Sequence, residues 1–247
     1  MIALRLCHLY PRELNIYADR GNIAVFERRL AWRGMRLDVV EVGIGDAMPV
    51  DADLYYLGGG QDRDQAIVAA DLRQQKAADL ARAAGGGAVV FAVCGGYQLA
   101  GHGYTGVDGT RMDGISLLDA DTVAGPSRLI GDLVIEAALD GERRSVVGFE
   151  NHAGRTRLGP DARPLGRVMS GNGNNGEDAG EGAVQGRIVG TYLHGPLLPK
   201  NPWLADHLIG WGLEHATGGK VELPPVDDSL ESTAHAAAIA RARRPRR

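Results

Sequence analysis

The stretch from Ala88 to Leu99 constrains the fold of this chain more than any other. It begins with the apolar, valine-rich run 88–93, which stops at Cys94 and two glycines. A short apolar run bounded by glycine is typical of a buried central strand, and the small residues after it let the backbone turn sharply into a helix. This arrangement is that of a nucleophile elbow, with cysteine in the place of serine. The alternative is a structural cysteine, because free cysteine is among the most buried residue types.

The first hundred residues alternate between predicted strands and helices. Strands are predicted for 2–9, 36–42 and 53–57. Helices are predicted from Asn22 and over 62–84, where apolar residues recur at near-helical spacing. This alternation is typical of α/β proteins with a mostly parallel sheet and helices on its faces.

The later part of the chain contains extended segments without long helices between them. Segments 128–139 and 145–149 predict an antiparallel β extension of the sheet. A late strand is predicted over 182–193, and it ends at His194. Pro202 then opens a helix with one apolar stripe.

The segment 171–176 reads Gly-Asn-Gly-Asn-Asn-Gly and therefore fits the dinucleotide-binding spacing G-x-G-x-x-G. That motif requires a strand before it and a helix directly after it, and neither is predicted here. Asparagine and glycine are turn formers, so we interpret this segment as a surface or active-site loop.

The chain is predicted to form one domain over 1–223, followed by a tail over 224–247. The tail is polar, then alanine-rich, and it contains five arginines near its end. Such a composition favours a mobile, solvated segment.

Composition excludes several classes of function. The formal net charge is −4 without a clustered basic face, so nucleic-acid binding is not expected. No apolar stretch approaches the roughly 20 residues that span a bilayer, so no transmembrane segment is expected. The two cysteines, Cys7 and Cys94, are expected to be reduced, which indicates a cytoplasmic protein. The seven histidines show no zinc-ligand spacing beside a cysteine pair, so no metal site is expected.

Cys94 and His194 follow two different predicted strands, which is the usual arrangement of a nucleophile and its base. A neighbouring imidazole makes the reactive thiolate available at neutral pH. The backbone N–H of Gly95, together with one from the triple-glycine loop 58–60, centred on Gly59, can form an oxyanion hole. These groups together predict acyl-transfer chemistry.

The elbow resembles that of the class I glutamine amidotransferases, whose motif C-x-G-x-Q stands here as Cys94-Gly-Gly-Tyr-Gln98. The segment 190–195, Gly-Thr-Tyr-Leu-His-Gly, resembles the cobyric-acid-synthase-type branch, which lacks a glutamate two positions after the histidine. Within this branch the chain is most similar to the GatD family, the glutaminase subunits of lipid II isoglutaminyl synthases. That similarity covers most of residues 10–216 and rests on the segments 14–23, 149–156, 173–176 and 194–202.

The resemblance implies a flavodoxin-like fold and the hydrolysis of L-glutamine to glutamate and ammonia. It also implies a partner, a MurT-like ATP-dependent ligase subunit that amidates the D-glutamate α-carboxyl of lipid II. This chain contains no G-x-x-x-x-G-K-[ST] phosphate loop, so we expect ATP and Mg²⁺ on the partner and no cofactor here. Contact with the inner face of the membrane would then come through the partner and its substrate.

The resemblance assigns further site residues. Arg128 matches the arginine that contacts the glutamine substrate in this family, and a guanidinium suits a carboxylate. Gln98 is expected to position the substrate amide or to cap the elbow helix. The third member of the triad stays open: Cys94 and His194 act as a dyad, or Asp19 or Glu150 orients the imidazole.

Three alternatives remain at this stage. The first is a glutaminase subunit of another, cobyric-acid-synthase-like amidotransferase. The second is a free-standing cysteine hydrolase of the same fold, and the third is a non-catalytic scaffold that regulates a ligase. The presence of both Cys94 and His194 argues against the scaffold.

Overall fold

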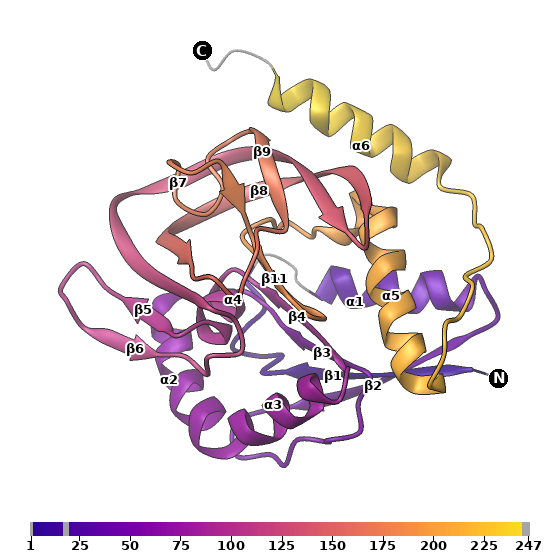
Figure 1. The fold of residues 1–247 in the computed structure, drawn as a ribbon, viewed down its shortest axis with the longest axis horizontal. Coiled ribbons are helices and arrows are strands. Elements are labelled where there is room, and N and C mark those ends of the chain that lie inside the picture. Colours follow the sequence, from indigo (N-terminus) through magenta and orange to yellow (C-terminus); the bar gives the residue numbers. More distant parts are fainter. Residues whose placement is uncertain (1, 17–19, 244–247) are drawn as a thin grey trace.

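Six strands form the main sheet in the computed structural model, which describes residues 2–16 and 20–243 (Figure 1). Five run parallel, and the edge strand β11 is antiparallel to its neighbour. Because the carboxyl ends of parallel strands share one edge, the loops that follow them converge there. In spatial order the strands are β11 (Ala183–Gln185), β12 (Ile188–Thr191), β4 (Val89–Val93), β3 (Leu54–Leu57), β1 (Ala3–Leu9) and β2 (Arg36–Val42).

Helices cover both faces of this sheet (Figure 1). On one face α1 (Arg20–Ala31) packs against α5 (Pro202–Thr217), which follows the short 3₁₀ helix η2 (Leu198–Lys200). The predicted helix over 62–84 is present on the other face as an uninterrupted helical run with a π-helical turn inside it. This run consists of α2 (Asp62–Asp71), η1 (Leu72–Lys76) and α3 (Ala77–Gly85), and the elbow helix α4 (Gly95–Ala100) lies against α2.

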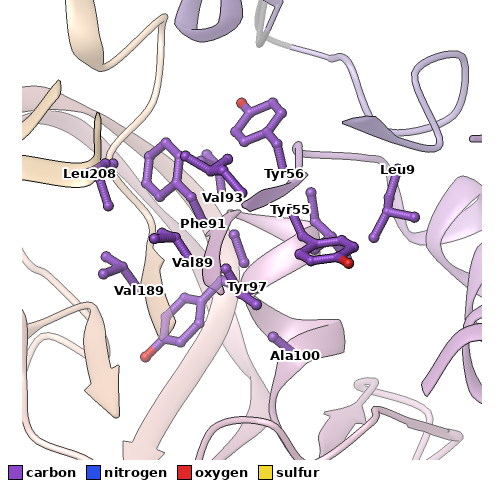
Figure 2. Close-up of a cluster of buried hydrophobic side chains, with 14 of the residues drawn as sticks. Leu9, Tyr55, Tyr56, Val89, Phe91, Val93, Tyr97, Ala100, Val189 and Leu208 are labelled. Atoms are coloured by element: carbon purple, nitrogen blue, oxygen red, sulfur yellow. The ribbon is translucent and has the colours of Figure 1, made fainter. Parts of the chain in front are cut away.

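The hydrophobic core surrounds strand β4. All five residues of β4 are fully buried, and Figure 2 shows Phe91 and Val93 beside Tyr56 of the neighbouring strand β3. A strand that is covered on both faces needs apolar residues at every position rather than at alternate positions. This requirement explains the unbroken apolar run before Cys94.

A second sheet extends the fold and is built on one long hairpin (Figure 1). Asp140 and Gly141 connect its two strands with φ of 47° and 82°, the conformation of the tight turns that suit twisted hairpins. The predicted antiparallel extension is therefore confirmed, with longer strands than the sequence indicated. The sheet contains β7 (Ala120–Leu139), β8 (Glu142–Leu158), β5 (Gly103–Thr105), β6 (Arg111–Asp113), β9 (Gly166–Ser170) and β10 (Gly180–Glu181).

The prediction of one late strand over 182–193 is wrong. The structure places two short strands there, β11 and β12, which pair as a hairpin. Gly186 allows the turn between them because its φ of 58° lies in the left-handed region. Only β12 then joins β4 in the parallel part of the sheet.

The segment after residue 223 contains a docked helix, α6 (Ser229–Ala242), rather than an unstructured tail through residue 243. It crosses the outside of β7 and β8, although none of its residues is fully buried (Figure 1). Before it, Asp228 accepts a hydrogen bond from the buried Arg29 of α1 at 2.6 Å. The domain boundary and the mobility of this segment stay predictions.

None of the helices in residues 2–16 and 20–243 is long and apolar enough to cross a membrane.

Candidate active site

Cys94 occupies a sharp turn between β4 and α4. Its φ of 51° and ψ of −108° are unusual for a residue with a side chain, and such strain costs about 1–3 kcal/mol. The turn lies close to the end of β3, because the Gly96 N–H donates to the Gly58 carbonyl at 3.0 Å. A Cβ on Gly96 would lie 2.7 Å from the Leu57 carbonyl oxygen, so this position requires glycine. The predicted elbow geometry is confirmed.

Cys94 lines a cavity of about 440 Å³ at the carboxyl edge of the main sheet, and the residue is 7% exposed. Arg63 of α2 and Arg128 of β7 place two positive charges in the lining of this cavity. The cavity therefore suits a small substrate that carries a carboxylate. Its lining residues are Ile16, Gly60, Gln61, Arg63, Cys94, Arg128 and Asn151.

His194 follows β12, the strand next to β4. The Cys94 N–H donates to the Thr191 carbonyl at 2.8 Å, so the ends of the two strands are tied together. The backbone of His194 also forms two hydrogen bonds with the backbone of Phe149 in β8, at 3.0 and 3.1 Å. The pairing thus brings the predicted nucleophile and base to one edge of the sheet.

The imidazole of His194 is fully buried, and its pKa is lowered from 6.5 to about 4. Burial is the main cause, because it disfavours the charged form. Electrostatic interactions with His152 and Arg128 lower this pKa further, whereas the Glu150 carboxylate raises it. His194 is therefore neutral at pH 7, which is the form that accepts a proton.

Glu150 is a fully buried carboxylate whose charge acts on His194. One oxygen accepts hydrogen bonds from the Asn172 backbone N–H at 2.9 Å and from its side-chain Nδ2 at 2.7 Å. The other accepts from the Gly173 N–H at 2.9 Å. The glycine- and asparagine-rich loop thus binds a carboxylate of the protein itself. Asp19, the other carboxylate considered from the sequence, lies outside the described residues.

Arg128 is held in place beside the cavity. Its Nε donates to the Asn151 side-chain oxygen at 2.7 Å, and its Nη2 donates to the Asn151 carbonyl at 2.8 Å. The register between β7 and β8 shifts between Ala124 and Leu129, so Arg128 lies outside the regular ladder of the two strands. This irregularity lets the side chain reach the cavity wall.

The triple-glycine loop contributes Gly60 to the cavity wall. Gly59 precedes it, and the Gly59 carbonyl accepts a hydrogen bond from the Ile16 N–H at 3.1 Å. Gly95, the first residue of α4, directly follows Cys94. The loop and the elbow thus meet at the cavity through Gly60 and Cys94, and the assignment of Gly59 and Gly95 as oxyanion donors stays a prediction.

Residues 5–202 match the profile of the CobB/CobQ-like glutamine amidotransferase domain. The chain belongs to this family. It is 38% identical to subunit GatD of the glutamine-hydrolyzing lipid II isoglutaminyl synthase of Staphylococcus aureus, over 100% of this chain and 99% of that protein. The GatD subunit of Streptococcus pneumoniae is 37% identical over 92% of this chain and 87% of that protein. The predicted family resemblance is confirmed.

Other glutamine amidotransferases are also similar to this chain. A cobyric acid synthase of Rhodobacter capsulatus is 33% identical over 81% of this chain but only 41% of that enzyme. Among solved structures, a glutamine amidotransferase of Thermotoga maritima has a TM-score of 0.52 at 16% identity and covers 96% of this chain and 94% of that one. The likeness confirms the predicted fold class.

Gln98 of the amidotransferase motif lies in a buried network beneath the elbow. Its Nε2 donates to the Tyr192 hydroxyl at 3.1 Å, and Tyr192 also shares a 2.7 Å hydrogen bond with Thr156. The ring of His152 stacks on Tyr192 with centroids 3.6 Å apart. The Gln98 amide therefore bonds a tyrosine hydroxyl rather than capping the elbow helix, and its predicted role in positioning the substrate amide stays a prediction.

Sequence reasoning missed several buried polar residues of this family member. Glu181 is fully buried, accepts hydrogen bonds from Thr191 and the Tyr192 N–H, and has a pKa that burial raises to about 7. His152 donates a hydrogen bond from its Nδ1–H to the Gly154 carbonyl at 2.8 Å. The segment 149–156 contained a sequence signal for His152, whereas nothing around Glu181 marked it.

Neither Cys7 nor Cys94 forms a disulfide, as predicted. Cys7 is fully buried in β1, and burial raises the pKa of its thiol to about 12. It is therefore protonated and inert at neutral pH. Within residues 2–16 and 20–243 no cluster of three or more His, Cys, Asp or Glu side chains is arranged to hold a metal ion.

The lowered pKa of His194 predicts a specific dependence of stability on pH. Because the folded pKa of about 4 lies below the unfolded value of 6.5, the contribution of His194 is complete above pH 6.5 and is lost as the pH falls through 4. This loss reaches about 3 kcal/mol at pH 4. We expect His194→Gln to lose correspondingly less free energy of unfolding than the wild type between pH 7 and pH 4 in urea titrations.

His8 offers an independent comparison, because it is also buried with a pKa lowered to about 4. His8→Leu should flatten the same pH dependence by a similar amount. Identical pH dependence in the wild type and both variants would contradict a neutral, buried state of these imidazoles.

Proposed function

We propose that this chain is the glutaminase subunit of a lipid II isoglutaminyl synthase. The observation that carries the proposal is Cys94, which stands on a strained elbow in the wall of a cavity that also contains Arg128. The neutral base His194 follows the adjacent strand. The similarity to the GatD subunits spans 99% of the Staphylococcus aureus protein, which supports the same role for this chain.

The proposed reaction begins with proton transfer from the Cys94 thiol to the neutral imidazole of His194. The thiolate attacks the side-chain amide carbon of glutamine. The amide oxygen of the substrate takes up the negative charge and is bound between backbone N–H groups of Gly95 and the triple-glycine loop. His194 then gives its proton to the departing nitrogen, and ammonia leaves a γ-glutamyl thioester on Cys94. Water activated by His194 cleaves the thioester to glutamate and restores the thiol.

Glu150 supports this cycle by its charge. During the reaction His194 becomes an imidazolium inside the protein, where a buried positive charge is unfavourable. The nearby carboxylate of Glu150, fixed by three hydrogen-bond donors, stabilises that transient charge. We therefore assign Glu150 as the electrostatic third member beside Cys94 and His194.

We propose that ammonia release and ATP-dependent amidation take place on two different subunits. It has a candidate glutaminase site but no G-x-x-x-x-G-K-[ST] sequence to bind nucleotide phosphates. We propose that ATP and Mg²⁺ bind to a MurT-like ligase subunit in the cytoplasm. That subunit would activate the D-glutamate α-carboxyl of lipid II and receive ammonia from the Cys94 site.

The cobyric acid synthases suggest a second candidate, a glutaminase that serves a different acceptor. Their similarity to this chain covers 41% of the Rhodobacter capsulatus enzyme, so the matching part is a fraction of a longer protein. The two GatD subunits match over 99% and 87% of their length. This difference in coverage favours a separate subunit of the GatD kind.

The first prediction concerns the nucleophile. Cys94→Ala should abolish the release of glutamate from glutamine, because the thioester cannot form without the thiol. Cys7→Ala is the matched control and should retain activity, since the Cys7 thiol is buried and protonated. Glutamate release measured for both variants, alone and with the ligase subunit, tests the assignment. Activity in Cys94→Ala would disprove it.

The second prediction concerns substrate binding. Arg128→Ala should raise KM for glutamine far more than it lowers kcat, because a clamp on the α-carboxylate contributes equally to the ground and transition states. Arg157→Ala is a control, since Arg157 is exposed and pairs with Glu177. A raised KM in Arg63→Ala with a normal Arg128→Ala would assign the clamp to Arg63 instead.

The third prediction concerns the partner. Amidation of lipid II should require both subunits when glutamine is the nitrogen donor, whereas the ligase subunit alone should work only at high ammonium concentration. Cys94→Ala in the mixture should restore the need for ammonium. Amidation by this chain alone would overturn the proposed division of labour.

A further inference from the structure

The triple-glycine loop beside the cavity is fixed by its carbonyl groups. The Gly58 carbonyl accepts from the Gly96 N–H at 3.0 Å, and the Gly59 carbonyl accepts from the Ile16 N–H at 3.1 Å. The Gly60 carbonyl accepts from the side-chain Nε2 of Gln65 at 3.1 Å. Because a trans peptide is planar, each fixed carbonyl points the N–H of the next residue in the opposite direction. Of these three contacts, the one from Gln65 is made by a side chain.

Gln65 lies between the two backbone segments that would form the oxyanion hole. It belongs to α2, and its side chain is 2% exposed. A Cβ built on Gly95 would lie 2.8 Å from the Gln65 Cδ, so the amide packs directly on the residue after the nucleophile. One side chain thus contacts the glycine loop through Gly60 and the elbow through Gly95.

The polar character of Gln65 is not explained by packing. Its Oε1 is buried and has no hydrogen-bond partner in the structure, which disfavours an amide at this place. A methionine would fill a similar volume without an unpaired oxygen. The hydrogen bond from Nε2 to the Gly60 carbonyl is the contact that a methionine would lose.

We propose that Gln65 is a positioning residue for the oxyanion hole. It fixes the Gly60–Gln61 peptide, and with it the end of the triple-glycine loop, at a set distance from Gly95, so that backbone N–H groups of both segments face the developing charge. This inference rests on the proposed glutaminase function. Because the oxyanion exists only in the transition state and intermediate, the loss of this alignment should lower kcat and leave KM unchanged.

Two variants test the role of the Nε2 donor. Gln65→Met keeps the volume but removes the donor, and we expect kcat for glutamine to fall about 100-fold at an unchanged KM. Gln65→Glu places a carboxylate against the Gly60 carbonyl, and protonation of this carboxyl restores a donor. Its kcat relative to wild type should therefore rise as the pH falls from about 8 to about 5.5, because burial raises a carboxyl pKa.

Alkylation of Cys94 by iodoacetamide distinguishes a misaligned oxyanion hole from a disrupted turn at Cys94. This reaction forms one carbon–sulfur bond, expels iodide and uses no oxyanion hole, so its rate in Gln65→Met should match the wild type. Gln185→Met is the matched control, since the Gln185 side chain accepts a hydrogen bond from the Asp119 N–H away from the cavity. It should keep a normal kcat.

Three results would overturn the inference. The first is a wild-type kcat in Gln65→Met, and the second is a raised KM at an unchanged kcat, which would make Gln65 a substrate contact. The third is a ratio of the Gln65→Glu kcat to the wild-type kcat that does not change with pH. This result decides the question even if Gln65→Met fails to fold. The proposed function fails by a different result, a wild-type protein that releases no ammonia from glutamine with or without the ligase subunit.

Discussion

The parallel pairing of β4 with β12 is the constraint on which the site depends. It places Thr191 beside Val93 and lets the Cys94 N–H donate to the Thr191 carbonyl at 2.8 Å. The nucleophile turn and the segment that carries His194 therefore start from a common edge, although a hundred residues separate them. The fully buried run of β4 fixes this edge within the core, so the geometry is supported by the most buried part of the molecule.

The second sheet contributes two charged residues to the site, Glu150 and Arg128. Strand β8 carries Glu150, whose carboxylate interacts electrostatically with His194, and the loop after β9 fixes that carboxylate with Asn172 and Gly173. Strand β7 brings Arg128 to the cavity wall. A neutral buried base with a fixed counter-charge nearby suits a reaction in which the imidazole gains and returns a proton in each half of the cycle. Under the proposed function, the β extension takes part in the chemistry as well as in the fold.

The elbow and the fold class were predictable from sequence because their determinants are local. A strand covered on both faces requires an unbroken apolar run, and a sharp turn after it requires glycine, so residues 88–96 carried both signals. The late strand was predicted as one element because the turn at Gly186, between Gln185 and Arg187, was read as part of a single extended segment. Gln65 and Glu181 were missed because their partners include residues distant in sequence or backbone atoms, which leave no pattern of their own.

The covalent intermediate tests the central claim most directly. The protein is mixed with glutamine, quenched in acid within the first turnover and examined by mass spectrometry of its peptides. The account predicts one γ-glutamyl group on the peptide that contains Cys94 and none on the peptide that contains Cys7. A γ-glutamyl group on any other residue, or active protein that never carries one under these conditions, would contradict it.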